Sequence, residues 1–293
     1  MEIRVLNYFV ETARLQNMTK AAQKLHVSQP TLSKQLKELE EELGQKLFNR
    51  SKHHSYLTAE GEILYKRATA ILSIVRKTEA EFQSMVDFNG GDIFIGCAES
   101  YGIHIIAIVI KELRQTYPNI KFHLYSGNYD MVTERLNQGL IDFGITVQNI
   151  DTSSYNSLTL PYQDSWGLLM RKDSPLAEKV KVQISDLMNL PLIISRQGFT
   201  DEMPNELKEM SPSLNIIGTY NLAYNASIFV QEGLGYAICF DNLIHPNSST
   251  NLTFKKIDPP ILSSMKLIWT DPESLSRTAK LFLEQIESEV SRQ

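Results

Sequence analysis

The sequence predicts an α/β protein with a helical N-terminal head that carries a winged helix-turn-helix, a long connecting helix, and a C-terminal α/β body. Apolar residues recur at helical spacing over residues 2–43, and a longer apolar repeat follows over 64–85. From residue 92 onward, strand and helix patterns alternate. The 293 residues correspond to about two domains, and 42% hydrophobic residues suffice for buried cores.

The composition predicts a soluble cytoplasmic protein without a membrane partner. The longest purely apolar run, 105–110, is too short to span a bilayer, and charges interrupt the apolar N-terminus. The two cysteines, Cys97 and Cys239, are too few for a disulfide framework, so we expect reduced thiols in the core rather than redox sensors. Residues 1–87 carry a net charge of +2 and residues 88–293 one of −7, which weakly favours a polyanionic partner for the head.

The head begins with two helices, at residues 2–16 and 20–25. Thr19 is the expected N-cap of the second helix, in which Ala21 and Ala22 are small enough for another helix to approach closely. The apolar stripe of the first helix is Ile3, Leu6, Val10 and Ala13.

A third helix follows a tight connection at His26 and Val27. Ser28 is its expected N-cap, Pro30 lies in the first turn, and Gly44 ends it. Its buried stripe consists of Leu32, Leu36, Leu39 and Leu43. Two helices joined by about three residues predict a helix-turn-helix.

The exposed face of the third helix presents polar side chains, namely Gln29, Thr31, Ser33, Lys34 and Lys37. Glutamine pairs bidentately with adenine, and lysine donates to guanine or phosphate. The N-terminal end of such a helix enters the major groove. The alternative interpretation is the ordinary solvated face of a core helix.

A small β-hairpin, or wing, is predicted next, because apolar pieces at 47–48 and 56–58 flank the polar segment 49–55. Arg50 and Lys52 would then meet DNA phosphates or a minor groove. No metal site is expected at His53 and His54, since no further ligand stands at a suitable spacing.

Residues 18–61 closely resemble the winged helix-turn-helix of LysR-type transcriptional regulators. The matching elements are Ala21-Ala22, Leu25, Val27-Ser28-Gln29-Pro30, Leu32-Ser33, the Leu-Glu-Glu run, Gly44, Leu47-Phe48, Arg50 and Leu57-Thr58. Lys34 departs from the family's usual arginine, which weakens bidentate guanine recognition, and Ala59-Glu60 stands where Glu-Ala is usual. The resemblance implies a bacterial regulator that binds double-stranded promoter DNA at the nucleoid, with RNA polymerase as a further partner. Its expected DNA-binding residues are Thr19, Ser28, Gln29, Pro30, Thr31, Ser33, Lys34, Lys37, Arg50 and Lys52.

The connecting helix begins after Thr58, a good N-cap, and ends before Asn89-Gly90-Gly91. Its apolar positions step by four and three, as in a coiled coil: Leu64, Ala68, Ile71, Val75, Thr78, Phe82 and Met85. The alternative is a helix packed on its own domain. The resemblance implies an antiparallel dimerising linker, and homotetramers paired through the C-terminal bodies.

The body shows a βαβαβ pattern at 92–97, 103–117, 120–125, 130–140 and 142–147, which predicts a parallel sheet. Further strands are expected at 166–170, 192–194, 215–217, 236–240 and 265–269, and further helices at 224–231 and 274–290. Small polar segments follow the strands at 99–101, 126–128, Thr146 and 195–197, where open α/β sheets bind ligands. No dinucleotide fingerprint, phosphate-binding loop or catalytic set is present in the sequence, so we expect neither an enzyme nor a cofactor or metal.

The resemblance extends over the body and implies a two-subdomain effector domain of the type 2 periplasmic-binding-protein kind. The expected domains are 1–58 for DNA binding, 59–88 for the linker and 91–293 for the effector, with subdomain I at 91–161 and 267–293 and subdomain II at 162–266. A small anionic effector would lie between the subdomains. Its expected contacts are Ser100, Tyr101, Asn128, Thr146, Arg196, Phe199, Thr200 and Tyr220. Alternatively, Ser100 only caps its helix and Arg196 is solvated.

The leading hypothesis is therefore a ligand-responsive transcription factor. A small-molecule binding or transport protein is the first alternative, and the winged motif argues against it. A metabolic enzyme of α/β fold is the second, and it lacks a catalytic constellation in the sequence.

Overall fold

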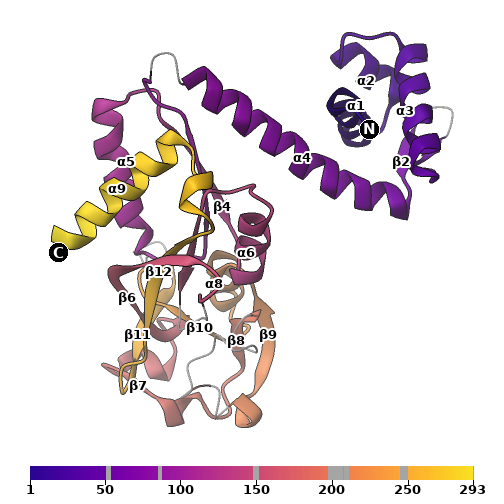
Figure 1. The fold of residues 1–293 in the computed structure, drawn as a ribbon. Helices are drawn as coiled ribbons and strands as arrows, with labels where there is room; N and C mark the ends of the chain where they lie inside the picture. The colour runs from indigo at the N-terminus through magenta and orange to yellow at the C-terminus, as the bar shows by residue number, and fades with distance from the viewer. Residues whose placement is uncertain are drawn as a thin grey trace. The chain divides into compact units, whose positions relative to one another are not determined.

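The computed structural model describes residues 1–50, 54–84, 88–147, 152–196, 207, 211–244 and 250–292. The chain divides into two compact units, a head at residues 1–86 and a body at 87–293 (Figure 1). No helix within these described ranges has the length and apolarity needed to cross a membrane.

The head contains the predicted helices and hairpin. Their bounds are α1 Ile3–Leu15, α2 Met18–Lys24, α3 Gln29–Leu43, β1 Phe48–Arg50, β2 Ser55–Leu57 and α4 Ala59–Ser84. The strands β1 and β2 pair antiparallel, as a wing requires. The core joins α1, α2, α3 and the wing around Phe9, Leu32 and Leu36, none of which is exposed.

Three details of the head differ from the prediction. Asn17, not Thr19, caps α2, because its side-chain oxygen accepts a hydrogen bond from Lys20 N at 2.9 Å. Ile3 and Leu43 are exposed, at 52% and 40%, because each lies in the terminal turn of its helix, beyond the reach of the core.

The helix α4 packs on its own domain over its first half, as the alternative interpretation expects, and leaves apolar side chains exposed in its second half, where Phe82 belongs to the predicted stripe and Ile74 does not. Ala68 and Leu72 are buried in the head core, and Ile71 packs against it, so the first half is covered by its own domain. In the second half Ile74 and Phe82 are exposed, at 46% and 65%. Met85, the last predicted position, lies outside the described residues.

The body is built on one sheet of strands in the order β4-β3-β5-β12-β6-β10-β8-β9, with β11 pairing β6 and β7 pairing β11. The strands are β3 Asp92–Cys97, β4 Lys121–Ser126, β5 Phe143–Val147, β6 Asn156–Arg171, β7 Val182–Gln183, β8 Leu192–Ser195, β9 Ile216–Tyr220, β10 Tyr236–Phe240, β11 Leu252–Asp258 and β12 Leu262–Trp269. The helices are α5 Ile103–Thr116, α6 Tyr129–Asn137, α8 Ala223–Gln231 and α9 Arg277–Arg292, with 3-10 helices η1 Pro175–Glu178, η2 Ile184–Leu187, η4 Ser211–Ser213 and η5 Pro272–Ser274.

The long strand β6 joins the two halves of this sheet. Its residues 156–165 pair antiparallel with β12, whereas 166–169 pair with β10 and 167–171 with β11. Only 166–170 were predicted as strand, and β11 was not predicted, because its lysines break the apolar alternation.

Helices cover the faces of both halves (Figure 1). The helices α5 and α9 pack on the face that carries Ile93 and Ile95, and α6 packs near Phe94. The helix α8 covers Ile193 and Cys239 in the other half. Both cysteines are buried, and burial raises the pKa of Cys239 to about 12, which suits the expected core thiols.

Candidate functional site

The exposed end of α3 is built as the sequence predicted. Ser28 Oγ accepts a hydrogen bond from Thr31 N at 3.2 Å and lies 2.7 Å from Thr31 Oγ1, so the cap also orients the Thr31 hydroxyl. Pro30 lies in the first turn, where its missing N–H leaves no hydrogen bond unmade. Gln29 and Pro30 are exposed beside this cap.

The other predicted DNA-binding residues differ in what the structure describes of them. Lys34 and Lys37 are exposed and pair with Glu38 and Glu41 one turn on, at 3.7 and 3.2 Å. Thr19 is exposed on α2, and Ser33 is half-buried on α3. Arg50 belongs to β1, but its side chain lies outside the described part of the structure, as does the whole of Lys52.

A buried carboxylate that the sequence analysis did not single out ties the wing to α3. Glu40 is 4% exposed, and its Oε1 accepts hydrogen bonds from Leu47 N at 2.9 Å and Phe48 N at 3.2 Å. Lys46 Nζ lies 3.8 Å from Glu40 Oε2. The wing therefore starts at a set position relative to the helix that carries Gln29.

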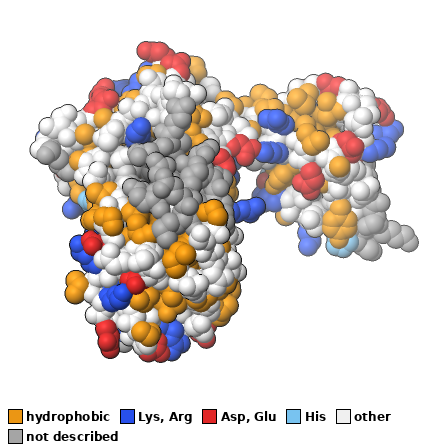
Figure 2. All heavy atoms as spheres, turned by 90° about the horizontal axis from the view of Figure 1, so that it is seen from below, with side chains coloured by type: hydrophobic (Ala, Val, Ile, Leu, Met, Phe, Trp, Pro, Cys, Tyr) orange, Lys and Arg blue, Asp and Glu red, His pale blue; other side chains and the backbone are white. Residues whose placement is uncertain are grey.

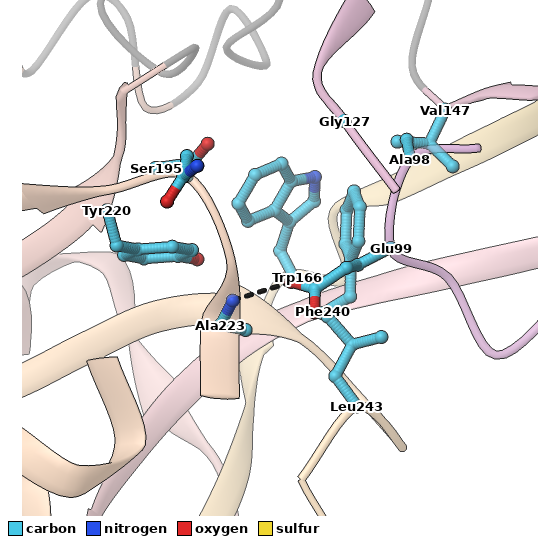
Figure 3. A pocket seen from close by; sticks show the side chains of 11 residues that line it. Ala98, Glu99, Gly127, Val147, Trp166, Ser195, Tyr220, Ala223, Phe240 and Leu243 are labelled. Carbon is cyan, nitrogen blue, oxygen red and sulfur yellow. Dashed lines mark hydrogen bonds between the residues drawn. The ribbon is translucent and has the colours of Figure 1, made fainter. Parts of the chain in front are cut away.

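A cavity lies where strands of both halves of the body end (Figure 3). Its enclosed volume is about 40 Å³, room for a few water molecules, within a wider hollow of about 430 Å³ that includes open solvent. Residues of the first half that line it are Ala98, Glu99, Gly127 and Val147. Residues from β6 and the second half are Trp166, Ser195, Tyr220, Asn221, Ala223, Phe240 and Leu243.

Three aromatic rings form walls of this cavity. The Trp166 and Phe240 rings lie 4.4 Å apart between centroids, tilted by 59°. The Trp166 indole N–H donates to Ser263 Oγ at 2.9 Å, and the Tyr220 hydroxyl donates to Ile238 O at 2.7 Å. Because these polar groups are already bonded within the protein, the parts of the rings that reach the cavity are apolar, and in Trp166 and Phe240 these parts are small.

Glu99 spans the cavity from the end of β3 to the start of α8 (Figure 3). Its Oε2 accepts a hydrogen bond from Ala223 N at 2.5 Å, at the N-terminus of a helix whose N-cap residue offers no side-chain bond. Burial raises the pKa of Glu99 above its ordinary value, and the bond from Ala223 opposes that shift.

Ser100 does not line the cavity, contrary to the expectation. It is 5% exposed, its hydroxyl donates to Asp164 Oδ2 at 2.7 Å, and it accepts from Gly102 N at 2.9 Å. Asp164 is fully buried, and burial raises its pKa to about 7, with Asp241 adding to the rise and the Ser100 bond opposing it. The chain's own carboxylate thus occupies the start of α5, where the sequence placed an anionic effector.

The remaining predicted effector residues are only partly brought together. Tyr220 lines the cavity, whereas Asn128 caps α6 by accepting from Met131 N at 3.0 Å. Thr146 is buried, and its hydroxyl has no partner among the described residues. Tyr101 and Arg196 are exposed, and Phe199 and Thr200 lie outside the described residues.

Trp166 and Phe240 are cavity residues that the sequence analysis missed. Phe240 ends a predicted strand, so the rule that ligands bind beyond strand ends could have found it. Trp166 carries no such signal, because it lies inside β6, which extends far beyond the predicted strand.

Comparison with known proteins gives two family matches that together cover most of the chain. Residues 87–291 match the LysR substrate binding domain, and residues 3–62 match the bacterial regulatory helix-turn-helix protein of the lysR family. The uncharacterized HTH-type transcriptional regulator YwbI of Bacillus subtilis is 29% identical over 98% of this chain and 96% of its own. The regulator BsdA of the same organism is 28% identical over 97% of this chain and 99% of its own.

Solved structures share the fold over the full length. The crystal structure of full-length CbnR complexed with its target DNA covers 98% of this chain and 99% of that chain, with a TM-score of 0.78 and 21% identity. That of full-length BenM covers 100% and 97%, with a TM-score of 0.51 and 24% identity.

Proposed function

The chain belongs to the LysR family of bacterial transcriptional regulators, and from that premise we propose how its described residues bind DNA and an effector. Its helix-turn-helix binds DNA, and its substrate-binding domain receives an effector that modulates its activity; the family consists of regulators, not enzymes. In our proposal the DNA is double-stranded promoter DNA, which places the protein at the nucleoid in the cytoplasm, with RNA polymerase as a further partner.

The first proposal is that α3 and the wing make the DNA contacts. The observation that carries it is the Ser28 cap, which leaves Gln29 exposed at the entering end of α3, while Glu40 holds the wing beside that helix. Lys34 and Lys37 can exchange their partners on α3 for DNA phosphates. The remaining contacts are those expected from the sequence: Thr19, Ser28, Pro30, Thr31, Ser33, Arg50 and Lys52.

Electrophoretic mobility shift on promoter DNA over a range of salt concentrations tests this interface. Gln29→Ala should relax base preference at one position and lose roughly 1–3 kcal/mol of specific binding. Arg50→Ala should weaken binding to all sequences and lower the salt slope by about one. Arg4→Ala removes an exposed charge on α1 and is the matched control. Equal salt slopes for Arg50→Ala and wild type would remove Arg50 from the phosphate contacts.

The second proposal is that the effector lies in the cavity between two subdomains, at 91–161 with 267–293 and at 162–266. The change of partners along β6, from β12 to β10 and β11, supports this division, as does a lining drawn from both halves. The sequence predicted an anionic effector held by Ser100 and Arg196. The contact with Ser100 is not supported, because the Ser100 hydroxyl already donates its hydrogen bond to Asp164.

The third proposal concerns assembly into homodimers and homotetramers. Ile74 and Phe82 leave an apolar surface on α4 that a second copy would cover. Apolar side chains also reach the surface of the body, as Figure 2 shows for one face. Among all the exposed apolar side chains of the body are Phe122 and Leu124 on β4, at 45% and 51% exposed, and Tyr224 and Phe229 on α8, at 66% and 54%. Analytical ultracentrifugation tests this proposal, and a monomer at micromolar concentration would contradict it.

A further inference from the structure

The charge of the cavity lining differs from what an anionic ligand requires. Among its described residues Glu99 is the one with a charged side chain, and no lysine or arginine lines it. Glu99 uses Oε2 to accept from Ala223 N, the bond that the described structure gives this carboxylate, and Oε1 is left to accept from a ligand. A carboxylate ligand at this point would meet Glu99 as a like charge.

A second carboxylate group lies beneath the same wall. Asp164 precedes Trp166 by two positions on β6, so both side chains leave the strand on the same face. Its Oδ1 is buried and has no hydrogen-bond partner among the described residues. Asp241 adds a third acidic group, which Lys256 Nζ pairs at 2.8 Å. Glu99 is therefore the acidic lining group whose charge no described basic lining residue offsets, and Asp164, with a pKa of about 7, adds negative charge beneath this wall as the pH rises above that value.

The aromatic walls favour the same charge in the ligand. Trp166 and Phe240 are 4% and 6% exposed, and Tyr220 lies across from them in the view of Figure 3. The polar groups of Trp166 and Tyr220 are used inside the protein, so what these rings present at the lining is apolar ring surface, a small exposed part of it in Trp166 and Phe240. Ring faces attract cations and apolar groups, and tryptophan does so most strongly.

We propose that the effector cavity selects an organic cation: an ammonium-bearing small molecule whose amine donates to Glu99 Oε1 and whose flat apolar portion packs against Trp166, Phe240 and Tyr220. This proposal rests on the proposed effector role of the cavity and names the chemical class of its ligand. Ser195 and Asn221, which also line the cavity, supply the neutral polar contacts.

The experiment compares two probes of similar shape and opposite charge, phenethylammonium and 3-phenylpropanoate, on the full chain near neutral pH. Trp166 and Trp269 are the two tryptophans, so a Trp269→Phe background leaves Trp166 as the one indole fluorophore. We expect saturable quenching of Trp166 by the cation at a concentration at least about tenfold below that at which the anion acts. Glu99→Gln should remove this preference, whereas Glu178→Gln, which neutralises an exposed carboxylate outside the cavity lining, should retain it.

Equal or tighter binding of the anion, or no quenching by the cation, would overturn the proposal. The preference of the protein with Glu99 intact decides this even if Glu99→Gln fails to fold. Promoter binding by the same preparation, measured by mobility shift, separates the two levels of inference. With DNA binding intact, saturable quenching of Trp166 by the anion at an equal or lower concentration refutes the ligand class and leaves the cavity as the ligand site, whereas quenching by neither probe counts against the cavity itself.

Discussion

Asp164→Asn should make the body more stable at alkaline pH than the wild type. Burial raises the pKa of Asp164 from an ordinary 3.8 to about 7. Between these values the folded protein keeps a proton that the unfolded chain releases, so stability declines as the pH rises from about 4 to about 7. Asparagine is neutral at every pH and keeps an oxygen that can accept from Ser100 Oγ.

The magnitude follows from the size of this pKa difference. A pKa about three units higher in the folded protein than in the unfolded chain corresponds to a loss of about 4 kcal/mol of wild-type stability. This loss is complete once the pH is above 7. About two of these units fall between pH 5 and pH 8, so the advantage of Asp164→Asn should grow by about 3 kcal/mol across that range. Nearby Asp241 raises the pKa of Asp164 further, and the Ser100 hydrogen bond lowers it.

Urea unfolding followed by tryptophan fluorescence measures this effect, because both tryptophans, Trp166 and Trp269, belong to the body. Asp173→Asn is the control. Asp173 is exposed, and its hydrogen bonds with Arg171 hold its pKa below the ordinary value, so it is ionised at both pH 5 and pH 8. An advantage of Asp164→Asn that stays constant or shrinks as the pH rises would refute the reasoning.

Three further predictions concern the wing, the linker and the start of α5. Glu40→Ala leaves two buried amides of the wing unsatisfied and should destabilise the head by about 1–3 kcal/mol, measured by thermal unfolding followed by circular dichroism. Exposed Glu41→Ala is the control, and equal melting temperatures of the two variants would contradict this prediction. The double substitution Ile74→Asp and Phe82→Asp should dissociate the proposed linker dimer in sedimentation equilibrium, and an unchanged mass would exclude this surface from the interface. These positions are chosen because Ile71, in the predicted stripe, packs within its own head. Ser100→Ala removes a donor to Asp164, so the pKa of Asp164 in the folded protein should rise. The loss of stability should still begin near pH 4 but extend to a higher pH, and an unchanged upper limit would show that the bond contributes nothing.

Local patterns in the sequence determined the head almost completely. Ser28, the leucine stripe and Gly44 define α3 because caps and helical periodicity depend on residues within one or two turns. The cap of α2 was the exception, since Asn17 and Thr19 are both good capping residues and the actual start of the helix decides between them.

The tertiary structure alone decided the chemistry of the cavity. Trp166 and Phe240 meet because β6 and β10 pair across some seventy residues, and sequence periodicity carries no information on that register. Ser100 was correctly placed at the start of a helix, but its partner Asp164 comes from β6 and fills the position predicted for an anion. Whether a polar residue at a strand end faces a ligand or another part of the chain depends on long-range packing, so the sequence predicted where the cavity lies but not the charge that it presents.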